Sequence, residues 1–115
     1  MAAVLFHATL TTAAPLSVRA GQPANLKGYS LVNQGAANNY LKFYWTAGIE
    51  PPVVGTTVPN LTVAIPTGAG LGVVQSWPDG VTGNGQLWIA ATGGTGLDTD
   101  AGAPTTGVVV SLLLE

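Results

Sequence analysis

Glycine and proline interrupt this 115-residue sequence along almost its whole length. Sixteen glycines and eight prolines are present, and only a few short stretches lack both. Inside a helix, a glycine costs about 1 kcal/mol relative to alanine and a proline about 3 kcal/mol. Long helices are therefore disfavoured, whereas short apolar runs bounded by turn residues are typical of strands. The sequence predicts an all-β protein.

Eight segments have the composition or the alternation expected of strands. In residues 60–65, for example, Leu, Val and Ile alternate with Thr and Ala. This number of strands predicts a seven- to eight-stranded antiparallel sandwich, either jelly-roll-like or another Greek-key arrangement. We expect residues 1–15 to form an N-terminal arm or first strand, and residues 16–115 to form a single β-sandwich domain. The predicted strands are 3–10, 16–20, 25–33, 39–46, 60–65, 71–77, 86–92 and 107–114.

Turn residues separate these segments. Asn33-Gln34-Gly35 and Asp79-Gly80 are turn-forming stretches, and Asn84-Gly85 favours a tight hairpin. Pro78 is expected to end the strand that precedes it, because proline cannot donate to a strand ladder.

The last predicted strand is apolar without alternation. Val108, Val109 and Val110 are followed, after one serine, by three leucines that run to the penultimate residue. A run of this kind is typical of a strand buried on both faces. We therefore expect this strand to lie in the middle of a sheet under cover, or to have one face against another subunit.

Charged residues make up only 7% of the chain, against about 25% in an average soluble domain. The chain has three basic and five acidic residues. A free monomer normally stays soluble through a mixed charged surface. A neutral surface costs little to desolvate, so it suits permanent contact with other subunits. The alternative interpretation of the low charge is that the chain is a stable secreted or fibrous β-domain.

The low charge also argues against several partners. Nucleic-acid binding needs clustered basic residues to neutralise phosphates, whereas here the net charge is −2. No apolar run approaches the roughly 20 residues of a transmembrane helix. The N-terminus lacks the basic region of a signal peptide. Together with the absence of cysteine, these features favour assembly in a cytoplasm.

Residues suited to catalysis are few. His7 is the single histidine, and no cysteine is present; catalytic triads and zinc sites need histidine with specific partners. Asp98 and Asp100 could offer oxygen atoms to Ca²⁺. Loop aspartates, however, more often bond their own backbone, and no carboxylate pair suits glycoside hydrolysis. We predict no catalytic, metal-binding or cofactor-binding residue and no enzyme activity.

Seven of the eight aromatic residues allow two interpretations. Exposed Trp and Tyr side chains could stack on sugar rings and form a glycan-binding platform. Alternation within residues 39–46 instead places one set of aromatics in a core and the other at a core or subunit contact, which we favour. The seven residues are Tyr29, Tyr40, Phe43, Tyr44, Trp45, Trp77 and Trp88.

The middle and the end of the chain resemble a small family of bacteriophage structural proteins. The likeness covers roughly residues 16–114 and depends on short motifs that occur in the same order. The motifs are Asn25-Leu26-Lys27-Gly28-Tyr29-Ser30-Leu31-Val32-Asn33, Tyr40-Leu41-Lys42-Phe43-Tyr44, residues 52–55, Thr57-Val58-Pro59-Asn60-Leu61-Thr62-Val63-Ala64-Ile65-Pro66, Leu87-Trp88-Ile89-Ala90-Ala91-Thr92-Gly93, Asp98-Thr99-Asp100, Ala103-Pro104 and Val108-Val109-Val110.

Members of that family are described as capsid decoration, head-fibre or uncharacterised virion proteins with a jelly-roll-like fold and no catalytic residues. The resemblance implies a virion location. Combined with the neutral composition, it suggests a decoration protein that binds the outer surface of the major capsid protein, bridges its subunits and forms a homo-oligomer, a trimer or hexamer. The alternative is a receptor- or glycan-binding module of a head or tail fibre. A fibre tip usually follows a repetitive or coiled-coil shaft, and none is visible here.

Overall fold

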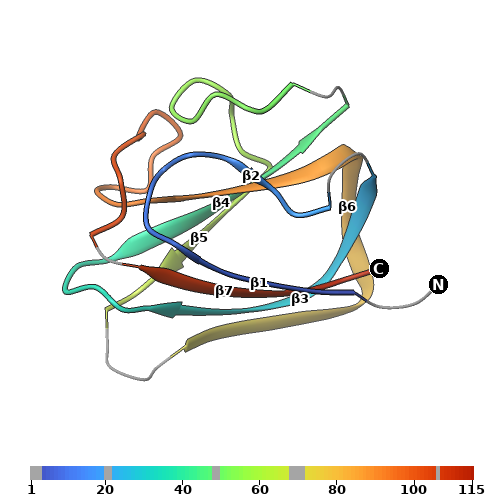
Figure 1. Cartoon of the computed structure of the whole chain (residues 1–115), viewed down its shortest axis with the longest axis horizontal. Coiled ribbons are helices and arrows are strands. Elements are labelled where there is room, and N and C mark those ends of the chain that lie inside the picture. The colour runs from blue at the N-terminus through green and yellow to red at the C-terminus, as the bar shows by residue number, and fades with distance from the viewer. Residues whose placement is uncertain (1–3, 20–21, 48–49, 68–71, 106) are drawn as a thin grey trace.

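The computed structural model describes residues 4–19, 22–47, 50–67, 72–105 and 107–115 (Figure 1). Within them the regular structure is entirely strand, and all strand pairs are antiparallel, which confirms the fold class predicted. The described part contains no helix that could cross a membrane. The strands are β1 (Val4–Leu10), β2 (Leu16–Ser17), β3 (Pro23–Asn33), β4 (Asn39–Thr46), β5 (Leu61–Ile65), β6 (Gly72–Thr92) and β7 (Val108–Leu114).

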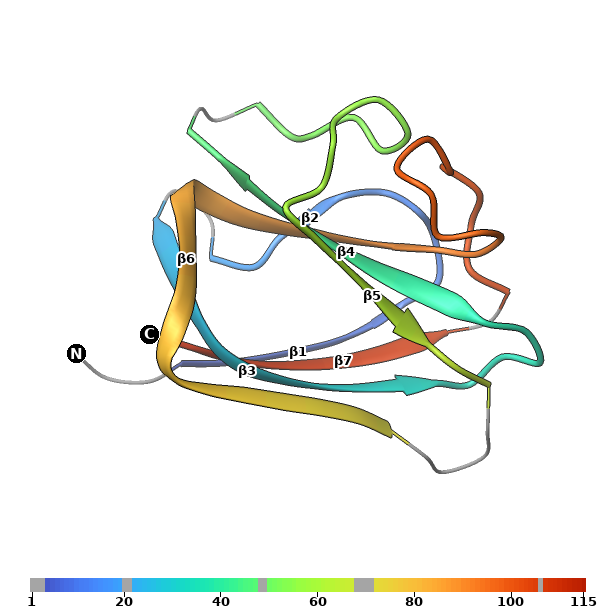
Figure 2. The same ribbon diagram turned by 180° about the vertical axis from the view of Figure 1, so that it is seen from behind.

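The strands form one sheet that folds over on itself. Their order is β1-β7-β3-β6-β4-β5, and β2 also pairs with β6. The first part of β6 pairs with β3, and its second part pairs with β4. Figures 1 and 2 show that β6 bends between these parts, so that the β1-β7-β3 layer faces the β4-β5 layer. This is a sandwich arrangement, whereas the strand order alone does not establish a jelly roll, which stays a prediction.

The long strand β6 differs from the prediction. Two strands, 71–77 and 86–92, were expected with turns between them, but the structure has one continuous strand. Gly80 and Gly85 have φ angles of +79° and +105°, which only glycine adopts readily, and they lie within β6 instead of in hairpins. Pro78 does not end the strand, because it lies where the β3–β6 register shifts, between Leu26 and Gly28, and such irregularities tolerate a missing N–H donor.

The first and last predicted strands pair with each other. β1 pairs with β7 over its whole length, from Val4 opposite Leu114 to Leu10 opposite Val108. The short predicted strand 16–20 is reduced to Leu16–Ser17. Residues 3 and 71, where two predicted strands begin, and residue 20, where a third ends, lie outside the described residues.

Strand β7 lies mid-sheet, between β1 and β3. Four of its side chains are fully buried in the core, but the alternate ones, Val109, Ser111 and Leu113, are partly or more fully exposed. Of the two alternatives, burial of both faces within the chain is therefore wrong, because no described segment covers the outward face, whereas one face against another subunit stays a prediction. The core side chains of β7 are Val108, Val110, Leu112 and Leu114.

Aromatic residues fill the space between the two layers. Phe43 of β4 is fully buried, and its ring lies 5.9 Å from that of Tyr29 on β3. The ring of Trp77 packs edge-on against Tyr29 at 5.6 Å. The contact of Tyr29 with Phe43 therefore connects β3 to the opposite layer, whereas that of Tyr29 with Trp77 lies within one layer.

Candidate functional site

The layer built from β1, β7, β3 and the first part of β6 presents an outward face that we call the neutral face. Its side chains follow from the strand register, because alternate residues of a strand point to the same side. None of the twelve is Asp, Glu, Lys or Arg. They are Leu5, His7 and Thr9 of β1, Val109, Ser111 and Leu113 of β7, Gly28, Ser30 and Val32 of β3, and Gly72, Val74 and Ser76 of β6.

The neutral face mixes apolar side chains with Ser, Thr, His and Gly, and part of it is solvent-exposed. Leu5 is 78% exposed and Val74 is 72% exposed. A shallow groove of about 250 Å³ has Leu5, Leu113, Gln75 and Gly28 in its lining. The exposed side chains of Leu5 and Leu113 are direct neighbours there, and grouped exposed apolar side chains mark interaction sites more often than scattered ones.

Charged side chains lie beyond the end of this face. Lys27 occupies the register shift of β3 and donates a hydrogen bond to the carbonyl oxygen of Pro78. Asp79 follows in the bend of β6, and Glu115 follows β7. The alternation of the strands therefore keeps charge away from the outward rows, which makes the face suitable for burial against a neutral partner surface.

His7 and Ser111 form a hydrogen bond on the neutral face, with 2.9 Å between Nδ1 and Oγ. No sequence pattern indicates this pair, since the contact depends on the β1–β7 register. A histidine beside a serine is part of a hydrolytic triad, but such a triad also needs an orienting carboxylate and preorganised oxyanion donors. The face carries no carboxylate, so this pair gives no support to a hydrolase.

The opposite layer has a polar side that is covered by the loop between β6 and β7. Lys42 of β4 is fully buried there. Its ammonium group donates to the carbonyl oxygens of Leu97 at 2.8 Å and Asp100 at 2.7 Å. The sequence analysis did not predict that Lys42 binds this loop, although a lone lysine on an aromatic-rich strand is a pattern that could have indicated a buried cation. The contacts hold the loop against β4.

Of the two loop aspartates, Asp100 stabilises the loop itself. The carboxylate of Asp100 accepts hydrogen bonds from the backbone N–H groups of Thr95 at 2.9 Å and Gly102 at 3.0 Å. These bonds lower the pKa of Asp100 below its ordinary value. Burial raises the pKa of the Tyr44 hydroxyl, and the nearby charge of Asp98 adds to that effect. Among described residues, no cluster of three potential metal ligands occurs.

The aromatic residues do not form an exposed platform. Phe43, Tyr44 and Trp45 are buried, and the indole N–H of Trp45 donates to the carbonyl oxygen of Ala24 at 3.1 Å. The other aromatic side chains are half-buried. Stacking on a sugar ring requires an exposed ring face, so the structure offers the core interpretation more support than the glycan-binding one.

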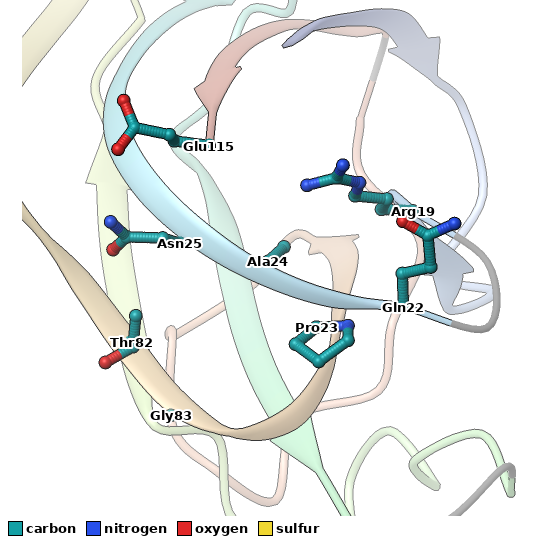
Figure 3. A pocket seen from close by; sticks show the side chains of 8 residues that line it. All are labelled: Arg19, Gln22, Pro23, Ala24, Asn25, Thr82, Gly83 and Glu115. Carbon is teal, nitrogen blue, oxygen red and sulfur yellow. The ribbon is translucent and has the colours of Figure 1, made fainter. Parts of the chain in front are cut away.

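A second hollow, of about 270 Å³, lies where β3 begins and β6 bends (Figure 3). Arg19 and Glu115 come from different sides of it, and Asn25 and Thr82 line it between them. It holds no histidine, thiol or pair of carboxylates. Glu115 is the one side-chain carboxylate in its lining, and no histidine or second side-chain carboxylate lines it to form an acid–base pair.

Comparison with protein-family models and with curated protein sequences gave no match for this chain. The inferences about function therefore rest on the neutral face, on the composition and on the resemblance described above.

Proposed function

We propose that this chain is a bacteriophage capsid decoration protein that binds the outer surface of the major capsid protein and bridges neighbouring subunits. The neutral face is the observation that carries this proposal. A flat face without charge loses little hydration energy when a partner covers it, whereas each uncompensated charge would cost several kcal/mol. The phage assignment itself comes from the family resemblance.

A decoration protein of this kind stabilises an assembled shell by mass action, since it binds the assembled state and not the free subunits. In this proposal the chain reaches the virion surface after assembly in the host cytoplasm, and it needs no cofactor, nucleic acid or membrane. Its partners are the major capsid protein and further copies of itself.

The alternative is a receptor- or glycan-binding module of a head or tail fibre. That function needs exposed aromatic rings, and Tyr44 and Trp45 are buried. The burial of these two rings supports decoration over the fibre function, and the half-buried rings of Tyr29, Tyr40, Trp77 and Trp88 are the ones that a fibre function would have to use.

Copy number per particle tests this proposal. Quantitative mass spectrometry of purified particles should find hundreds of copies, comparable with the number of capsid subunits. A few copies, or a few dozen, would support the fibre function instead. Stripping the protein from the particles should lower the temperature at which the shell opens, and an unchanged temperature would contradict a cementing role.

A further inference from the structure

The outer edge of β1 is an unprotected sheet edge. Among the described residues β1 pairs with β7 alone, and Figure 1 shows it at the margin of its layer. Natural proteins protect such edges with proline, lysine, inward charges or bulges. Val4–Leu10 contains no proline, glycine, lysine, aspartate or glutamate, and its pairing with β7 has no register shift.

The three other free edges in the described structure are less suited to pairing, and one of them, β2, has only two residues. The first part of β6 carries Pro78 and Asp79 beside its register shift with β3. β5 has only five residues, and prolines lie close to both of its ends, at positions 59 and 66. The seven residues of β1 form the longest regular edge among the described strands.

We propose that β1 pairs antiparallel with β1 of a second copy of this chain, about a two-fold axis at His7. His7 is the central residue of Val4–Leu10, so the register with full overlap places His7 opposite His7 of the second copy. In this register Leu5 lies opposite Thr9, and directly opposed residues share a sheet face. Both neutral faces therefore point to the same side of one continuous sheet.

Pairing along β1 doubles the neutral face that one assembly offers to a shell, and this step rests on the proposed function. Four strands about 4.8 Å apart, each of seven residues rising about 3.4 Å, cover roughly 450 Å² in projection, and two joined copies cover roughly 900 Å². A larger continuous face buries more surface against one partner, and specific interfaces typically bury about 800 Å² of accessible surface per partner. Three such pairs make a hexamer, whereas a cyclic trimer alone would leave the β1 edge unpaired.

A charge of either sign introduced at position 7 tests the pairing directly. The full chain, studied by sedimentation over a concentration series up to millimolar, should form dimers. His7→Lys and His7→Glu should each weaken the dimer at least tenfold, because like charges then lie directly opposite one another. An equimolar mixture of the two variants should restore dimers as mixed pairs, because opposite charges then meet at the axis.

Two matched variants identify the contact. Ser111→Ala removes the hydrogen-bond partner of His7 without adding charge and should leave the dimer intact. Val74→Lys lies on β6, away from β1, and should also leave the dimer intact while weakening attachment to a shell at least tenfold.

A chain that stays monomeric at every concentration overturns the proposal, and so does a mixture of charge variants that fails to dimerise. Loss of the dimer in Val74→Lys would mean that copies meet face to face, which also overturns it. Dimers that fail to bind a shell would contradict the proposed function and leave the β1 pairing standing.

Discussion

Lys42 shows how one buried charge can organise a loop. The aliphatic part of its side chain lies on a strand of bulky residues, and its ammonium group reaches two carbonyl oxygens of the 93–105 loop. Asp100 then bonds the backbone of the same loop through its carboxylate. Sequence patterns placed Asp98 and Asp100 in a loop but could not connect that loop to Lys42, because the contact spans 58 residues of sequence.

Replacing Lys42 by methionine should free this loop. Lys42→Met leaves two carbonyl oxygens without their donor, and we expect a loss of about 1–3 kcal/mol in the free energy of unfolding. Urea denaturation measures that loss, and hydrogen exchange should show faster exchange at the Asp100 amide, which donates to Leu97. Lys27→Met is the matched control, since Lys27 is less buried, and it should cost under about 1 kcal/mol. Equal effects of the two variants would contradict a special role for Lys42.

At the scale of the element, β6 is the strand that makes the sandwich. It is long enough to pair with β3 in one layer and with β4 and β2 in the other. The sequence located both halves of β6, because their apolar residues are distinct. It did not predict their continuity, because Asn84-Gly85 and Asp79-Gly80 favour hairpins locally, and only the pairing with neighbouring strands turns these glycines into a bend.

Gly85 is the position where this bend is most sensitive. Its φ is +105°, and an added Cβ would collide with the carbonyl oxygen of Thr46. Gly85→Ala should therefore lower the free energy of unfolding by about 2–4 kcal/mol, through backbone strain and overpacking. Gly102→Ala is the control, since a Cβ there would approach no atom closer than 3.4 Å, and it should change stability by under about 0.5 kcal/mol. Similar losses of stability for Gly85→Ala and Gly102→Ala in thermal or urea unfolding would contradict the special sensitivity of Gly85 in the bend.

At the scale of the whole molecule, the fold determines where the uncharged surface lies. Composition predicted a neutral surface but not where it would lie, because that depends on which strands become neighbours. The order β1-β7-β3-β6 brings the uncharged rows of both chain ends together with those of the middle. The apolar C-terminal run was expected to lie under cover or to have one face against another subunit; within the chain it buries one face in the core and presents Leu113 outward.

Binding of variants to particles stripped of this protein tests the central claim, that the neutral face is the docking surface. Val74→Lys and Val74→Asp place a charge of either sign on that face, whereas Val58→Lys and Val58→Asp place it on a side chain of similar exposure elsewhere, 67% against 72%. Quantified by sedimentation with the shells, both Val74 variants should bind at least tenfold more weakly than the unaltered chain, and both Val58 variants should bind as it does. Undiminished binding of the Val74 variants would contradict the account.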